Sequence, residues 1–112
     1  MENRSSVLLI FTGGTISMGE NSSNHSLAPL DTKQVLSFIP ELQMLHVNIA
    51  SVSFSPLIDS SDIQPSNWVE IASHIQTHYN DFDGFVVLHG TDTMAYSAAA
   101  LSFMLDGLRK PV

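Results

Sequence analysis

Three segments with strand-like patterns, each followed by polar residues, constrain the fold of this chain most strongly. Residues 7–11 (VLLIF) and 85–88 (FVVL) are continuous apolar runs, and residues 46–54 alternate between apolar and polar side chains. Continuous apolar runs of this length are typical of parallel strands that are covered on both faces. Alternation is a strand pattern as well. The sequence therefore predicts three strands.

Helical patterns lie between and after these strands. A short helix is predicted over residues 32–39, because Pro40 stops it. A longer helix opens at Pro65 and carries an apolar stripe at helical spacing. A third helix follows residue 93, with a stripe that runs to Leu108. The order β-α-β-α-β-α predicts an α/β fold, a three-layer Rossmann-like parallel sheet with right-handed crossovers and flanking helices.

Residues 17–31 are different in character. They are polar, rich in Ser, Asn and Gly, and show no apolar periodicity. A segment of this length without a pattern of its own predicts a mobile loop, and such loops often carry function.

Charge and composition exclude several kinds of partner. The chain of 112 residues has 4 basic and 11 acidic side chains, a net charge of −7 at pH 7. Nucleic acids and anionic membrane surfaces would repel it, so we expect neither as a partner. The chain has no cysteine, which fits a reducing compartment, and the run at residues 7–11 is too short for a signal peptide or membrane span. We therefore expect a cytoplasmic protein.

Polar segments follow all three predicted strands. They are residues 12–15 (TGGT), 59–62 (DSSD) and 89–93 (HGTDT). Because ligands of open α/β sheets bind beyond the carboxyl ends of the strands, these segments predict one common site. Each segment alone has an ordinary explanation: a strand-to-loop turn at Thr12, an Asx or Ser/Thr turn at residues 59–62, or a helix cap at Thr91 or Asp92.

Metal and cofactor sites find little support. Glu70, His74 and His78 are spaced four residues apart on the predicted helix from Pro65, and histidines at this spacing can bind zinc. A solvated helix face explains them better, since no further ligand is near in the sequence. The glycine pair after Thr12 lacks the lysine of a phosphate-binding loop and the third glycine of a dinucleotide fingerprint. We expect no metal and no cofactor.

Two segments resemble the two signature segments of the L-asparaginases: TGGTI at residues 12–16 and HGTDTM at residues 89–94. The serine turn at residues 59–61 lies between them. The stretch 83–105 is most similar to the bacterial type I, cytoplasmic branch. The resemblance implies hydrolysis of the small molecule L-asparagine to L-aspartate and ammonia, without metal or cofactor. It implies that Thr12 is a nucleophile that forms a β-aspartyl-enzyme ester. It also implies a homo-oligomer, dimer or tetramer, in the full-length form.

The resemblance also implies roles for the other polar residues. Thr91 matches a second catalytic threonine, which works with Asp92 and a lysine. Asp92 would also bind the α-amino group of the substrate, and Ser60 its α-carboxylate. Asp59 and Ser61 would line the same pocket.

Two departures from the family pattern qualify these roles. The family's lysine belongs to an element beyond Val112, and the loop near Thr12, HSLAP at residues 25–29, has no tyrosine where the family usually carries one. We therefore expect residues 1–112 to be an incomplete N-terminal α/β catalytic domain, inactive alone, with the rest of this domain and the C-terminal domain absent. Two alternatives stay open: a non-catalytic amino-acid-binding or assembly module, and a relative of the glutaminase or transfer-RNA-amidation type.

Overall fold

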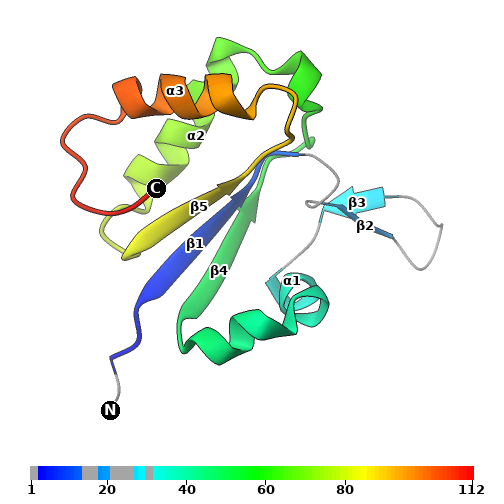
Figure 1. Cartoon of the computed structure of the whole chain (residues 1–112), viewed down its shortest axis with the longest axis vertical. Helices are drawn as coiled ribbons and strands as arrows, with labels where there is room; N and C mark the ends of the chain where they lie inside the picture. Colours follow the sequence, from blue (N-terminus) through cyan, green and yellow to red (C-terminus); the bar gives the residue numbers. More distant parts are fainter. Residues whose placement is uncertain (1–2, 14–17, 21–26, 30–31) are drawn as a thin grey trace.

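The first apolar run of the chain forms the central strand of a parallel sheet (Figure 1). A computed structural model describes residues 3–13, 18–20, 27–29 and 32–112. The sheet has the order β4-β1-β5, with β1 spanning Ser6–Phe11, β4 Asn48–Ser53 and β5 Gly84–Leu88. Leu8 of β1 lies opposite Ala50 on one side and Phe85 on the other, both in parallel register. All three predicted strands are confirmed.

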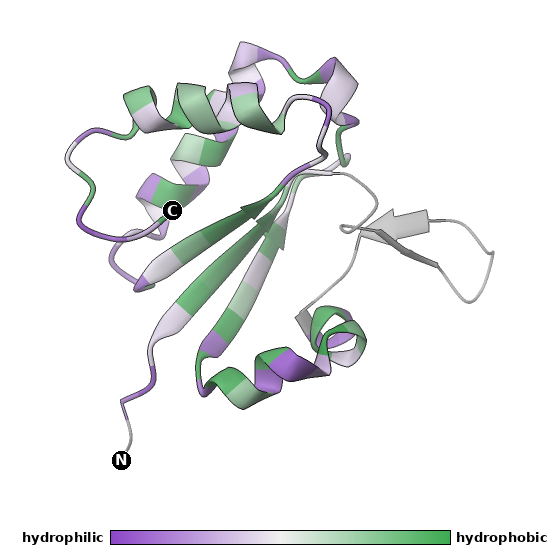
Figure 2. Ribbon diagram, in the orientation of Figure 1, coloured by the Kyte–Doolittle hydropathy of each residue, from purple (hydrophilic) through white to green (hydrophobic). Residues whose placement is uncertain are grey.

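Helices cover both faces of this sheet. Successive side chains of β1 point to opposite faces, so β1 contributes to a core cluster on each side. Leu8 and Ile10 pack in one core cluster with residues of α2 (Pro65–Thr77) and α3 (Met94–Met104). Leu9 and Phe11 pack in a second cluster with Val35 of α1 (Thr32–Phe38). Figure 2 shows hydrophobic colour along β1 and most of β5, the strands with continuous apolar runs. The predicted α/β fold with a parallel sheet between helices is confirmed.

Two expectations need correction. Within the predicted mobile loop, β2 (Met18–Glu20) and β3 (Leu27–Pro29) form an antiparallel pair, and the remaining residues of 17–31 lie outside the described residues. Strands of three residues are too short to show periodicity in the sequence. The predicted short helix does end before Pro40, and a 3-10 helix, η2 (Pro40–Leu45), follows it.

The second correction concerns the end of α3. The helix ends at Met104, so Leu105 and Leu108 are not helical as the apolar stripe predicts. Gly107 adopts a φ of 67°, a left-handed conformation that turns the chain away from the helix. Within the part of the chain that the structure describes, no helix is both long and apolar enough to cross a membrane.

Candidate active site

The carboxyl ends of the three parallel strands meet at one edge of the sheet (Figure 1). Thr12, directly after β1, is held there by β5 and by the segment that follows β4. Its backbone N–H and its Oγ1 hydroxyl donate to the carbonyl oxygen of Leu88 at 3.1 and 2.8 Å. Its own carbonyl accepts from the N–H of Ile58, after β4, at 2.9 Å. With 2% of its surface exposed, Thr12 is a buried hydroxyl at the centre of the edge.

Gly13 allows this close approach of β1 to the turn after β4. A Cβ atom on Gly13 would lie 1.7 Å from the carbonyl oxygen of Ile58, far inside any tolerated contact. The glycine next to Thr12 is therefore required by backbone packing. Gly14 and Thr15, the other members of the predicted segment, lie outside the described residues.

The serine turn, residues 59–61, has two exposed side chains and one buried side chain. Asp59 precedes a short 3-10 helix, η3 (Ser60–Asp62), and its Oδ1 accepts from the N–H of Ser61 at 3.0 Å and from the Ser61 hydroxyl at 2.9 Å. These bonds, the backbone one foremost, hold the pKa of the Asp59 carboxyl below its ordinary value of 3.8. Asp59 and Ser61 are exposed and form the expected Asx-type turn, whereas Ser60 is buried.

Ser60 joins the second polar segment to the third. A Cβ on Gly90 would lie 2.5 Å from Ser60 Oγ, so the segment after β5 passes directly over this side chain. Thr93 Oγ1 also donates to the carbonyl oxygen of Ser60 at 2.7 Å. The predicted convergence of the three segments is therefore present as backbone and side-chain contacts.

Thr91 and Asp92 occupy the exposed turn between β5 and α3. The N-cap residue of α3 is Thr93, and its hydroxyl bonds Ser60 instead of capping the helix. A helix cap therefore does not explain Thr91 or Asp92. Both side chains are open to solvent at the same edge of the sheet as Thr12 and Ser60.

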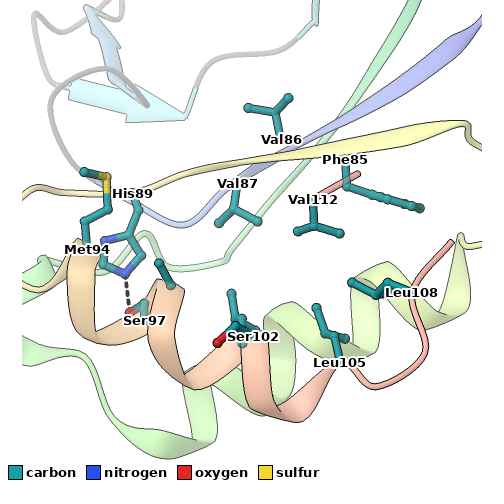
Figure 3. A pocket seen from close by; sticks show the side chains of 12 residues that line it. Phe85, Val86, Val87, His89, Met94, Ser97, Ser102, Leu105, Leu108 and Val112 are labelled. Carbon is teal, nitrogen blue, oxygen red and sulfur yellow. Dashed lines mark hydrogen bonds between the residues drawn. The ribbon is translucent and has the colours of Figure 1, made fainter. Parts of the chain in front are cut away.

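The structure also contains a polar network that sequence patterns did not single out, and Figure 3 shows its link between His89 and Ser97. His89 Nε2 lies 2.8 Å from the hydroxyl of Ser97 on α3, and its Nδ1 lies 2.6 Å from the carbonyl oxygen of Gly90. The indole Nε1 of Trp68 on α2 donates to the same hydroxyl at 2.7 Å. The one available signal was Ser97 itself, a polar residue among alanines on a helix with apolar character.

The helical histidines make aromatic contacts. The ring of His74 lies 5.9 Å from that of Phe54, and the ring of His78 meets Phe82 edge-on at 6.0 Å. Among the described residues, no cluster of three His, Cys, Asp or Glu side chains could hold a metal ion.

An apolar cavity of about 570 Å³ lies between β5 and α3 (Figure 3). Its walls include Val87, Met94, Ala98, Leu101 and Leu105, with His89 and Ser97 at one end. A zwitterionic amino acid would lose its hydration there without charged partners. The polar strand-end edge is the better place for a small polar ligand.

Comparison with known proteins agrees with the two sequence signatures. The family model "Asparaginase, N-terminal" matches residues 6–112. L-asparaginase 1 of Escherichia coli K12 is 44% identical over 110 residues, covering 97% of this chain and 32% of the relative. The crystal structure of L-asparaginase I from Vibrio cholerae superimposes with a TM-score of 0.76 at 39% identity, covering 97% of this chain and 32% of that one.

The chain also matches a relative that is named as an amidotransferase subunit and not as an asparaginase. One of the subunits of the glutamyl-tRNA(Gln) amidotransferase of Saccharolobus solfataricus is 38% identical over 111 residues, covering 97% of this chain and 24% of the relative. The chain thus spans about a third or less of the length of these relatives. Because the family model covers residues 6–112, nearly the whole chain, the chain belongs to the asparaginase family.

Proposed function

We propose that this chain carries the nucleophile and the first substrate contacts of an amidohydrolase that converts L-asparagine to L-aspartate and ammonia. The proposal rests on one observation: the three polar segments that follow β1, β4 and β5 contact one another at one edge of the sheet. Ile58 bonds Thr12, and Gly90 and Thr93 contact Ser60. Family membership supports amide hydrolysis, and the polar edge supports a small zwitterionic substrate.

The proposed reaction runs through the Thr12 hydroxyl. Its oxygen attacks the side-chain amide carbon of L-asparagine, the C–N bond breaks and ammonia leaves, which forms a β-aspartyl ester on Thr12. Water then hydrolyses the ester, releases L-aspartate and restores the hydroxyl. An amide is a poor electrophile, so the site must both take the hydroxyl proton and stabilise the oxyanion.

The remaining residues bind the substrate in this proposal. Ser60 holds the α-carboxylate, with Asp59 and Ser61 beside it, and the exposed Asp92 binds the α-ammonium group. Thr91 works with Asp92 as the second catalytic threonine. The Asp59 carboxylate, whose pKa lies below its ordinary value because of its hydrogen bonds with Ser61, supplies a negative charge that suits a substrate with an ammonium group.

Proton transfer limits what residues 1–112 achieve alone. The Thr12 hydroxyl donates to the Leu88 carbonyl, which is a hydrogen-bond acceptor but not a base. We infer that the proton acceptor comes from further chain elements, and that residues 1–112 are part of a larger α/β catalytic domain. The relatives support this, since the chain spans 32% of the Escherichia coli L-asparaginase 1.

The same hydrogen bond favours one alternative, a module that binds an amino acid without turning it over. The match to a component of an amidotransferase supports a second, a relative of the glutaminase or transfer-RNA-amidation type. Cytoplasmic location and assembly into a dimer or tetramer remain predictions.

Ammonia release from L-asparagine and L-glutamine tests the proposal. We expect no release from the 112-residue chain. We expect release from a chimera in which the Escherichia coli relative supplies the residues that follow. Thr12→Val in the chimera should abolish release, while Ser102→Ala, on the exposed side of α3, should leave it unchanged. A chimera that folds and binds L-aspartate but stays inactive would favour the binding module, and a preference for L-glutamine would favour the second alternative.

A further inference from the structure

We propose that His89 is a positioning residue that fixes the turn carrying Thr91 and Asp92, and that Ser97 and Trp68 hold its ring in a single tautomer. This role rests on the proposed function, because it concerns the same substrate-binding turn. The argument begins from the hydrogen-bond chain that links α2, α3 and the end of β5.

The direction of each bond follows from the chemistry of its partners. An indole N–H can only donate, so Ser97 Oγ accepts from Trp68. The Ser97 hydroxyl can then donate a hydrogen bond to His89 Nε2, 2.8 Å away. The carbonyl oxygen of Gly90 can only accept, so Nδ1, 2.6 Å from it, must carry a proton. All these preferences are met together by a neutral ring protonated at Nδ1.

Burial makes this arrangement rigid. Ser97 is 2% exposed, so a mispaired hydroxyl there would lack water to compensate. His89 lies directly before Gly90, and its Nδ1 forms a hydrogen bond with the carbonyl oxygen of that residue. Gly90 in turn lies against Ser60, and Thr93 bonds Ser60 from the far end of the turn.

The turn is consequently anchored on both sides. His89 holds its beginning to α3, and Thr93 holds its end to the serine turn. Thr91 and Asp92, the two exposed residues between these anchors, gain a defined position although their own side chains face solvent. A binding site needs such support, because loosely held groups lose their productive geometry.

NMR spectroscopy of the protein tests the first step. The ring nitrogens of His89 should show the neutral Nδ1–H tautomer in the wild type. Ser97→Ala should shift the ring toward a mixture of tautomers, whereas Ser102→Ala on the same helix should change nothing. Ser102 is the matched control, because its hydroxyl bonds only the carbonyl of Ala99 within the helix. An Nε2–H tautomer in the wild type would overturn the proposal.

Backbone order tests the positioning role without any ligand. Order parameters of Thr91 and Asp92 should lie near the rigid value of about 0.85 in the wild type and in Ser102→Ala. They should fall toward about 0.6 in Ser97→Ala. His89→Gln gives a second test should Ser97→Ala not fold, since an amide cannot bridge Gly90 and Ser97 as the ring does. Unchanged order in the folded variant would overturn the role.

Binding of L-aspartate separates this inference from the proposed function, and calorimetry measures it on the chimera with and without the same substitutions. We expect Ser97→Ala to bind about five-fold more weakly, the worth of one hydrogen bond, and Ser102→Ala to bind like the wild type. Equal binding by Ser97→Ala would overturn the positioning role. Absence of binding by the unsubstituted chimera would count against the proposed function, and the ring tautomer and order parameters would then decide the role of His89.

Discussion

Replacing Gly13 by alanine should destabilise this protein more than any other single methyl group added to a glycine described here. The new Cβ would lie 1.7 Å from the carbonyl oxygen of Ile58 and 2.8 Å from its carbonyl carbon. Carbon and oxygen atoms normally approach to about 3.3 Å, so the Ile58 peptide must retreat by about 1.5 Å. The obstacle is backbone and cannot rotate away.

That retreat also breaks the bond from the Ile58 N–H to the Thr12 carbonyl, which is 2.9 Å long. Overpacking in a tight interior costs about 1–3 kcal/mol, and a lost hydrogen bond adds about 1 kcal/mol. We therefore expect the free energy of unfolding to fall by about 3 kcal/mol. With a urea dependence of about 1.5 kcal/mol per molar, the unfolding midpoint falls by about 2 M.

Urea unfolding followed by the fluorescence of Trp68, the single tryptophan of the chain, measures this change. Gly107→Ala is the matched control, because no atom lies within 4 Å of its added Cβ. Its φ of 67° makes alanine strained by about 1 kcal/mol, a midpoint shift of roughly 0.7 M. If Gly13→Ala lowers the midpoint no more than Gly107→Ala, then close packing at the strand ends does not determine stability.

Three further outcomes follow from particular contacts. Ser61→Ala should raise the pKa of Asp59 but leave it below 3.8, because the stronger backbone bond survives, and carboxyl NMR titration checks this. Since that pKa is lowered by folding, its stabilisation is complete above the ordinary value and disappears as the pH falls through the folded one. Ile71→Ala, at a fully buried position, should cost about 2–5 kcal/mol in urea unfolding. Thr12→Val should cost at most about 1.5 kcal/mol in the same assay, because the Leu88 carbonyl keeps its bond from the backbone N–H of residue 12.

The sheet was predictable because each of its strands has a clear pattern in the sequence, either a continuous apolar run or an alternation of apolar and polar residues. The run at residues 7–11 is apolar at every position since Leu8 and Ile10 face α2 and α3 while Leu9 and Phe11 face α1. The end of α3 could not be predicted, because the sequence there has no such pattern. That helix is apolar or small on nearly every side, and even Phe103 is 88% exposed, so an apolar position carries no information about where the helix stops.

The site was predictable as a place but not as a set of contacts. Strand topology alone brings Thr12 and the segments after β4 and β5 to one edge. Which residues touch there depends on distances that no residue pattern encodes. The hydroxyls of Thr12 and Thr93 both donate to backbone carbonyls, and every residue supplies such a carbonyl. The link from His89 to Ser97 joins residues eight positions apart across a turn, which neither helical nor strand periodicity relates.

The contact between Gly90 and Ser60 gives the sharpest test of how the second and third segments fit. Gly90→Ala alone places its Cβ 2.5 Å from Ser60 Oγ and 2.8 Å from Ser60 Cβ, which should cost about 1–3 kcal/mol. Ser60→Gly removes both of those atoms, so the double variant should be no less stable than Ser60→Gly alone. In a urea double-mutant cycle this appears as a favourable coupling of about 1–2 kcal/mol. Additive losses would mean that the turn after β5 is held away from Ser60, and that the two segments do not form one interlocked edge.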